Sequence, residues 1–407
     1  MRTGLLGKTL AHSISPLLHG LLGDENYRLF EIPEEDVGAF MTGGAWDAIN
    51  VTIPYKKTVI PYCSSLSDRA AAIGSVNTVV RRPDGTLYGD NTDFAGFSDM
   101  ARDVDFKGRK TVILGSGGAS LTVQAAVKHL GASSVTVISR SGDDNYSNLS
   151  RHADADIIVN TTPVGMYPHE AESPISLDTF TSPSALLDLI YNPLRTRLVL
   201  EAADRGIYSR GGLRMLCTQA YEARRVFGCE NMIGTDTLYK TVLGERENIV
   251  IIGMPGCGKT VFGRKLSRKT GKKFFDTDIL IYERCGIRAG EIIEKYGEAR
   301  FREIESDVLR ELCRKSGVII ATGGGAVLRE ENRIAMRSCG RVLFIDRPPE
   351  KLTTDGRPLS STPEKLAALY EKRLPIYRAT ADITVKVPLW TREAEENLFA
   401  SCTRPLT

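Results

Sequence analysis

The sequence predicts an α/β protein of several domains, on three observations. Its length of 407 residues gives a prior of two to three domains, at ~150 residues each. Short apolar runs typical of strands alternate with segments of helical length, the order that produces a parallel, doubly wound sheet. At residues 114–120 and 253–260, such a strand runs into a glycine-rich turn followed by a helical segment.

Composition excludes several other classes of protein. With 42% hydrophobic and 25% charged residues the chain is typical of soluble globular proteins, and no apolar run approaches the ~18 residues of a membrane span. The eight cysteines include no CxxC pair, and the five histidines do not fall at metal-ligand spacing. We therefore expect reduced thiols, no structural zinc and, since no signal peptide is visible, a cytoplasmic protein.

The charge is distributed unevenly along the chain. Residues 1–244 carry 23 Lys and Arg against 27 Asp and Glu, whereas residues 245–407 carry 30 against 23. This difference indicates two domains or more, with the second part favouring anions. Its basic residues are interleaved with acidic ones, so no nucleic-acid partner is expected, and the lack of a long apolar run predicts no membrane partner.

The individual elements follow from local patterns. Residues 76–91 predict a β-hairpin around the turn Pro83-Asp84-Gly85. Four further strands are expected at 110–114, 135–140, 155–160 and 185–190, and an amphipathic helix is expected at 212–228. The strand–glycine–helix pattern then restarts at Ile249, after only about five residues and no Pro/Gly/Ser tether, which indicates closely joined halves.

The strongest motif is GMPGCGKT, Gly253–Thr260, which fits the phosphate-loop pattern G-x-x-x-x-G-K-[ST]. It follows an apolar strand and opens a helix, the context that supports the assignment. Glycines let backbone N–H groups surround phosphate oxygens, Lys259 supplies positive charge to the β- and γ-phosphates, and the Thr260 hydroxyl can ligate Mg²⁺. This part of the chain is therefore expected to bind a nucleoside triphosphate.

Carboxylates and arginines that could complete a phosphoryl-transfer site follow this loop. Asp276 and Asp278 are expected at the end of a strand with their side chains pointing the same way. One could hold Mg²⁺ while the other accepts a hydroxyl proton from the substrate. Arg302, Arg357 and Arg373, taken singly, are more typical of solvated surface residues.

The first half carries a weaker glycine motif. LGSGGAS, residues 114–120, follows a strand but has Ser120 where a third glycine of the dinucleotide fingerprint would stand. The next strand ends about 25 residues beyond Gly115, in Ser139-Arg140-Ser141. An arginine flanked by hydroxyls suits the 2′-phosphate of NADP better than the ribose hydroxyls of NAD.

Seven segments give the first half a specific resemblance. They are AHSISPLLH (11–19), NVTIPYK (50–56), IGSVNT (73–78), GDNTDFAGF (89–97), NTTPVGM (160–166), DLIYNP (188–193) and GLRMLCTQA (212–220). Their order resembles that of shikimate dehydrogenase. The resemblance implies that Lys56 is the acid/base group and that Asp93 orients it. It further implies a substrate site and an NADP site. The substrate site would comprise Ser13, Ser15, Thr52, Lys56, Asn77, Asp93, Tyr191 and Gln219. The NADP site would comprise Asp68, Gly115, Ser116, Gly117, Gly118, Ala119, Ser139, Arg140, Ser141, Leu189 and Gly212.

Residues 247–390 resemble shikimate kinase in the order of their motifs: the phosphate loop, D-T-D, F-R-x-x-E, G-G-G, R-P-L and R-x-P-x-Y. The resemblance implies that Arg302 and Arg373 grip the substrate carboxylate, that Gly324 lines the ring and that Asp278 holds the reacting hydroxyls. It implies Mg²⁺ ligation by Thr260 and Asp276, and catalytic roles for Lys259 and Asp278. The implied ATP-binding residues are Gly256, Cys257 (through its backbone), Gly258, Lys259, Thr260 and, from a lid, Arg357.

One departure from the kinase pattern concerns the lid. The family usually carries an arginine before the lid that packs on adenine, whereas this chain has a shorter segment with Lys351 as its nearest basic side chain. Loss of a cation–π contact predicts weak discrimination between nucleotide bases, with Lys351 as the first possible replacement.

Together the resemblances imply a bifunctional enzyme that uses NADP(H), ATP and Mg²⁺ to reduce 3-dehydroshikimate and then phosphorylate shikimate, as a monomer or homodimer. The expected domains are 1–100 with helices 213–243 returning to it, a Rossmann-like domain at 101–212, and a kinase domain at 245–407. Two alternatives stay open. One is an NAD-dependent quinate/shikimate dehydrogenase joined to another small-molecule kinase. The other is a non-catalytic, ligand-sensing repressor, which the presence of Lys56, Asp93, Lys259 and Thr260 disfavours.

Overall fold

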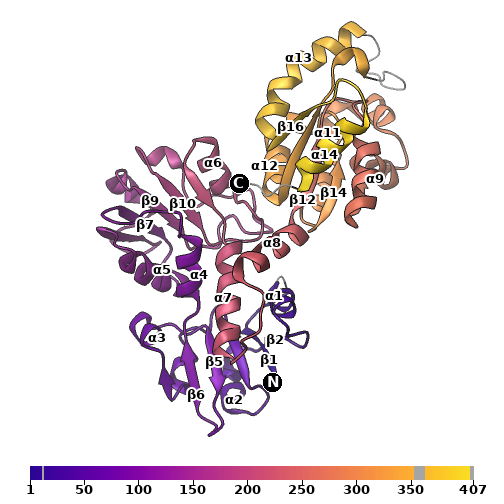
Figure 1. The fold of residues 1–407 in the computed structure, drawn as a ribbon. Coiled ribbons are helices and arrows are strands. Elements are labelled where there is room, and N and C mark those ends of the chain that lie inside the picture. Colours follow the sequence, from indigo (N-terminus) through magenta and orange to yellow (C-terminus); the bar gives the residue numbers. More distant parts are fainter. Residues whose placement is uncertain (12, 353–362, 404–407) are drawn as a thin grey trace. The chain divides into compact units, whose positions relative to one another are not determined.

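The computed structural model describes residues 1–11, 13–352 and 363–403 and confirms the α/β class with parallel sheets (Figure 1). The chain divides into two compact units. The first comprises residues 1–166, 173–191 and 201–243, and the second comprises residues 167–172, 192–200 and 244–407. Among the described residues, none of the helices combines the length and the apolar character that a membrane crossing requires.

The first unit begins with a six-stranded mixed sheet in the order β2-β1-β3-β5-β6-β4. Its strands are β1 (Thr3–Gly7), β2 (Arg28–Glu31), β3 (Ala48–Val51), β4 (Ser65–Leu66), β5 (Thr78–Arg81) and β6 (Leu87–Asp90). The predicted hairpin is confirmed as the antiparallel pair β5–β6. Its turn is closed by Asp84, whose carboxylate accepts hydrogen bonds from the backbone N–H and the hydroxyl of Thr86. Helices α1 (Ser15–Leu21), α2 (Val37–Thr42) and α3 (Asp68–Ile73) connect these strands.

A second sheet of the first unit has the order β11-β10-β9-β7-β8, and all of its strand pairs are parallel. Its strands are β7 (Lys110–Leu114), β8 (Ser134–Ile138), β9 (Ile157–Asn160), β10 (Ala185–Asp188) and β11 (Tyr208–Arg210). The predicted doubly wound sheet is therefore confirmed. The associated helices are α4 (Asp93–Met100), α5 (Gly118–His129), α6 (Arg197–Asp204), α7 (Leu213–Val226) and α8 (Thr235–Arg246).

Helices α4 and α7 pack side by side in the first unit (Figure 1). Gly96 of α4 permits this approach, because a Cβ atom there would lie 2.6 Å from the carbonyl oxygen of Met215. The same atom would lie 3.1 Å from the Cβ of Gln219. This close packing fixes the start of α4, which carries Asp93, against the helix that carries Gln219.

The second unit is built on a five-stranded parallel sheet in the order β13-β14-β12-β15-β16. Its strands are β12 (Asn248–Ile252), β13 (Lys273–Asp276), β14 (Val318–Ala321), β15 (Gly340–Asp346) and β16 (Ile383–Lys386). Its helices are α9 (Lys259–Thr270), α10 (Thr277–Cys285), α11 (Ala289–Cys313), α12 (Glu330–Cys339), α13 (Pro363–Thr380) and α14 (Arg392–Thr403). The central strand β12 is buried along its whole length, as a parallel strand covered on both faces requires. Short 3₁₀ helices complete the two units: η1 (Glu34–Asp36), η2 (Ile60–Tyr62), η3 (Tyr146–His152), η4 (Leu177–Thr179), η5 (Ala326–Leu328) and η6 (Pro349–Lys351).

Two short segments from the first half of the chain, 167–172 and 192–200, are part of the second unit. Arg195 of the latter segment forms a fork to both carboxylate oxygens of Asp382, at 2.7 and 3.0 Å, and donates to the carbonyl oxygens of Arg337 and Gly340. In the former segment, Glu170 accepts from the Arg314 guanidinium at 2.9 Å. Paired, charge-assisted bonds of this kind are among the stronger side-chain interactions, so both segments are firmly held.

Candidate active sites

The phosphate loop leaves the end of β12 and wraps around the first residue of α9. Gly256 and Gly258 adopt left-handed backbone conformations, with φ of 81° and 101°, which glycine reaches without a Cβ clash. Lys259 is buried and its ammonium donates to the carbonyl oxygens of Gly253 and Met254, both at 2.9 Å. The positive charge thus lies inside the curl of the loop, beside the helix N-terminus that favours phosphate oxygens.

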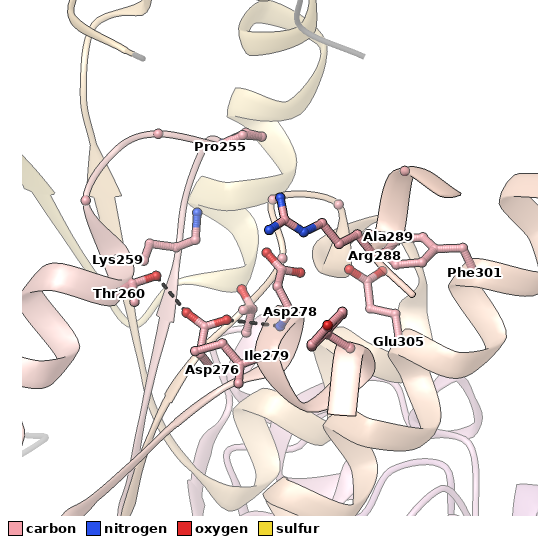
Figure 2. A pocket seen from close by; sticks show the side chains of 18 of the residues that line it. Pro255, Lys259, Thr260, Asp276, Asp278, Ile279, Arg288, Ala289, Phe301 and Glu305 are labelled. Carbon is pink, nitrogen blue, oxygen red and sulfur yellow. Dashed lines mark hydrogen bonds between the residues drawn. The ribbon is translucent and has the colours of Figure 1, made fainter. Parts of the chain in front are cut away.

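The expectation that Asp276 and Asp278 both extend from a strand is wrong. Asp276 ends β13, but its Oδ1 accepts a hydrogen bond of 3.0 Å from the backbone N–H of Asp278. This bond is a helix N-cap, so the chain turns into α10 and Asp278 lies in its first turn. Both carboxylates nevertheless line one cavity (Figure 2). The Thr260 hydroxyl donates to Asp276 Oδ2 at 2.6 Å, and these two hard oxygen donors fit Mg²⁺.

A cavity of about 1320 Å³ connects the phosphate loop to a cluster of charged side chains. Arg373 donates to the Gly324 carbonyl oxygen at 3.1 Å, and Arg302 pairs with Glu305 at 2.6 Å. The predicted residues that line this cavity are Gly256, Gly258, Lys259, Thr260, Asp276, Asp278, Arg302, Gly324 and Arg373. Cys257 is fully buried, so its thiol side chain faces the core. Arg357 lies outside the described residues.

Glu305 belongs to this cluster, although the sequence analysis assigned it no role. It is 1% exposed, and its Oε1 has no hydrogen-bond partner among the described residues. Burial raises the pKa of its carboxyl group, and the Arg302 guanidinium opposes that rise. Gly323 and Gly325 leave the room for both side chains, since Cβ atoms there would lie 2.5 Å from Glu305 Oε1 and 2.3 Å from Arg302 Nη2. The sequence could have indicated this pair, because residues three positions apart on a helix, such as Arg302 and Glu305 on α11, lie on the same face.

In the first unit, Lys56 and Asp93 form an ion pair of 2.6 Å between Nζ and Oδ2. Their side chains are 15% and 8% exposed, so the pair is largely withdrawn from solvent. Asp93 begins α4, and Asn77 positions that start. The Asn77 side chain accepts from the Thr92 backbone N–H at 2.7 Å and donates to the Thr92 hydroxyl at 3.1 Å. A lysine held in this way can deliver or accept a proton at a defined place.

The predicted dinucleotide loop lies next to this pair. A Cβ atom on Gly118, the first residue of α5, would lie 3.9 Å from the Cβ and Cδ of Lys56. Gly115 has φ of 99°, and a Cβ atom there would lie 2.9 Å from the Thr161 hydroxyl. The glycine turn therefore brings the start of α5 close to the predicted acid/base group.

Of the other predicted cofactor residues, Gly212 and Leu189 are in close contact, and the rest are described by their exposure. Gly212 passes so close to Leu189 that a Cβ atom would lie 2.0 Å from the Leu189 carbonyl oxygen. Arg140 and Ser141 are exposed just beyond β8, and Ser139 donates its backbone N–H to the Asp144 carbonyl oxygen at 3.2 Å. Ser116 and Gly117 are exposed in the turn before α5, Ala119 is half-buried, and Asp68 is exposed at the first position of α3.

The remaining predicted substrate residues occupy varied settings. The hydroxyl oxygens of Ser13 and Ser15 lie 3.2 Å apart. Thr52 and Tyr191 are half-buried, and Gln219 donates to the Leu216 carbonyl oxygen at 3.1 Å. Asn77 is 2% exposed, with its amide bonded to Thr92, so the described contacts place it as a support for the Asp93 helix.

The fold and the two sites define an enzyme class in which a dinucleotide-binding unit of oxidoreductase type is joined to a phosphate-loop unit of kinase type. A family model described as shikimate dehydrogenase substrate binding domain matches residues 5–79, and one described as shikimate kinase matches residues 255–402. A shikimate dehydrogenase (NADP(+)) from Clostridium beijerinckii is 33% identical over 245 residues, which cover 55% of this chain and 90% of that protein. The chain belongs to the shikimate dehydrogenase family and carries a shikimate kinase domain in its C-terminal part.

Solved structures agree with this assignment. Shikimate dehydrogenase 1 from Peptoclostridium difficile is similar with a TM-score of 0.55 and 34% identity, covering 59% of this chain and 97% of that one. A shikimate 5-dehydrogenase from Thermus thermophilus in complex with NADP(H) and shikimate is similar with a TM-score of 0.53 and 28% identity, covering 59% and 97%. The expectation of an oxidoreductase and a kinase of the shikimate pathway on one chain is confirmed.

Proposed function

We propose that this chain catalyses two successive reactions: NADPH-dependent reduction of 3-dehydroshikimate to shikimate, and ATP-dependent phosphorylation of shikimate to shikimate 3-phosphate. The proposal is supported mainly by two groups of side chains on one chain: the Lys56–Asp93 ion pair, and the residues that line the cavity around Lys259. The product of the first reaction is the substrate of the second. We propose the domain limits 1–100 with 213–243, 101–212 and 245–407 for these activities.

For the reduction, NADPH, when bound, would supply the hydride that adds to the carbonyl carbon of the substrate. Lys56 then gives its proton to the carbonyl oxygen as negative charge develops there, and Asp93 keeps the ammonium oriented at 2.6 Å. The partial burial of this pair strengthens its attraction and excludes competing water. Around it, we propose that Ser13, Ser15, Thr52, Tyr191 and Gln219 hold the carboxylate and hydroxyls of the substrate.

For the phosphorylation, Lys259 and the loop N–H groups would hold the phosphates, and Thr260 with Asp276 would hold Mg²⁺, which would neutralise charge on the phosphates. Arg302 and Arg373 bind the substrate carboxylate, and Gly324 supports the ring. We propose that Asp278 accepts the proton of the attacking hydroxyl, since its carboxylate enters the same cavity as the phosphate loop (Figure 2). Glu305 orients Arg302 through their bond of 2.6 Å.

A single coupled assay tests the proposal. The full chain is incubated with NADPH, 3-dehydroshikimate, ATP and Mg²⁺, and both NADPH consumption and shikimate 3-phosphate are followed. We expect both, with phosphate product appearing after shikimate. NADPH consumption without phosphate product would leave the dehydrogenase proposal alone. Activity with quinate and NAD would instead support the first alternative, and ligand binding without either reaction would support a sensor.

Cofactor choice provides a first prediction. Arg140→Ala is expected to raise the KM for NADPH about ten-fold or more and to leave the KM for NADH nearly unchanged, because a charge-assisted bond to the 2′-phosphate is worth ~1.5–3 kcal/mol. The measurement is steady-state kinetics with each cofactor. Lys128→Ala, which removes an exposed cation at the far end of α5, is the control and should change neither value. Equal effects of Arg140→Ala on both cofactors would mean that Arg140 is structural.

A further inference from the structure

We propose that the indole of Trp390 is the surface on which the nucleotide base stacks in the kinase site, in place of the arginine that this chain lacks before its lid. The inference rests on the proposed kinase function and adds the residue on which the base of the nucleotide is held. It is specific to this chain, because it follows from where the loop between β16 and α14 places one of the two tryptophans of the sequence.

The position of Trp390 is the first support. The residue lines the same cavity as Gly258, Lys259 and Val261. A Cβ atom on Gly258 would lie 2.4 Å from Cζ2 and 3.0 Å from Nε1 of the indole, so the ring edge packs directly against the phosphate loop. Only a glycine at position 258 leaves space for this contact. Val261, one residue beyond Thr260, is 59% exposed beside it.

The second support is that the ring is held in place before any nucleotide arrives. It packs against Phe262 with centroids 6.4 Å apart, and Phe262 in turn packs against Phe399 at 5.3 Å. Helix α14 begins immediately after the tryptophan and is capped by Thr391, whose hydroxyl accepts from the Ala394 N–H at 3.1 Å. An ion pair between Lys265 and Glu395 at 2.5 Å links α9 to α14. Preorganisation of this kind reduces the entropy that binding must remove.

The chemistry of a nucleoside triphosphate indicates which of its groups contacts Trp390. A helix N-terminus favours phosphates, and the cavity that contains the start of α9 is also lined by Val261 and Trp390, so it offers the ribose and base a place beside these side chains. A flat, half-exposed indole at this place offers a stacking surface to any base, because each base has a π-face. Stacking carries no hydrogen-bond pattern, so it strengthens binding without selecting the base. Lys351, the replacement expected from sequence, is exposed on η6 and is not among the residues that line the cavity.

The experiment compares Trp390→Ala and Trp390→Phe with the full-length parent. Kinase velocity is measured at saturating shikimate against ATP and GTP, with inorganic tripolyphosphate as a competitive inhibitor. We expect Trp390→Ala to raise the KM for ATP and for GTP by a similar factor of ten or more, or about 1.4 kcal/mol, with the inhibition constant for tripolyphosphate unchanged. Trp390→Phe should stay near the parent values. In the parent, KM values for ATP and GTP should agree within about ten-fold.

Leu389→Ala is the matched control, because Leu389 is the adjacent residue, is 56% exposed and lies outside the cavity lining. It should leave all three constants unchanged. A KM for ATP within two-fold of the parent in Trp390→Ala would overturn the proposal. So would a loss of tripolyphosphate binding that matches the loss of ATP binding, since the loop itself would then have been disturbed.

Binding can be tested independently of turnover. The other tryptophan, Trp46, is fully buried in the first unit, so a change of tryptophan emission on ATP binding would come from Trp390. We expect ATP to quench emission in the parent, tripolyphosphate to leave it unchanged, and Trp390→Phe to abolish the ATP response. Absence of quenching in the parent would contradict stacking. If the parent bound ATP with quenching but did not phosphorylate shikimate, the proposed reaction would be wrong and the stacking proposal would stand.

Discussion

Replacing Lys56 with alanine is expected to lower the turnover of 3-dehydroshikimate reduction by ~10²–10⁴-fold, the usual contribution of a positioned acid/base group. The physical reason is the loss of the only proton donor that the site holds in our proposal, while Asp93 is left without its partner at 2.6 Å. The measurement is NADPH oxidation at saturating substrate. Kinase activity on added shikimate should persist, because Lys56 belongs to the first unit and Lys259 to the second.

The neighbouring residue provides the control for this experiment. Lys57 is exposed and follows Lys56 directly, so Lys57→Ala changes the same loop and the same charge without touching Asp93. It should retain the parent turnover. If Lys57→Ala and Lys56→Ala lost activity to the same extent, the general positive charge of the loop, and not a placed proton donor, would explain the loss.

Replacing Asp278 with asparagine is expected to lower shikimate phosphorylation by ~10²–10⁴-fold, because the amide has nearly the same shape but cannot accept the hydroxyl proton. The local fold should survive, since the cap of α10 uses the backbone N–H of residue 278 and the side chain of Asp276. The measurement is ADP release in the presence of shikimate and Mg²⁺. NADPH oxidation by the same preparation reports that the chain is folded.

A second acidic residue of α10 tests whether the effect is specific. Glu283 is exposed and lies outside the cavity lining, so Glu283→Gln removes one negative charge from the same helix without altering the site. Its kinase activity should equal that of the parent. Retention of more than one tenth of the activity in Asp278→Asn would assign the proton to another acceptor, and Glu305, a carboxylate of the same cavity, is a candidate.

Much of the fold could be predicted because it depends on local signals. An apolar run followed by glycines and then by an amphipathic segment is typical of a strand, a phosphate-binding type of turn and a helix. This is why β7 with α5, and β12 with α9, were found from sequence. The hairpin β5–β6 was found for a similar reason, since the Pro-Asp-Gly turn and its flanking β-branched residues agree with one another.

The features that could not be predicted depend on contacts between residues, which the local sequence around each residue does not show. The prediction that Asp278 lies on a strand was wrong, because the Asp276 side chain caps α10 and the chain is already helical at Asp278. Glu305 is the last residue of the F-R-x-x-E motif, but its place beside Arg302 and two glycines that leave it space is shown only by the structure. The importance of Trp390 depends on its approach to Gly258, which lies more than a hundred positions away in the sequence. Long-range proximity of this kind has no local pattern.

The chain passes between the two compact units five times. A single division of the chain therefore does not separate the two units cleanly. A gene that split at residues 243 and 244 would produce a kinase without segments 167–172 and 192–200. Asp382 would lose its ion pair with Arg195, and Arg314 would lose its ion pair with Glu170. A division at this junction would therefore remove two ion pairs from the kinase unit, whereas an end-to-end fusion can be divided at its junction without such a loss. The two activities therefore cannot be separated by one cut in the gene without loss of contacts from the kinase unit.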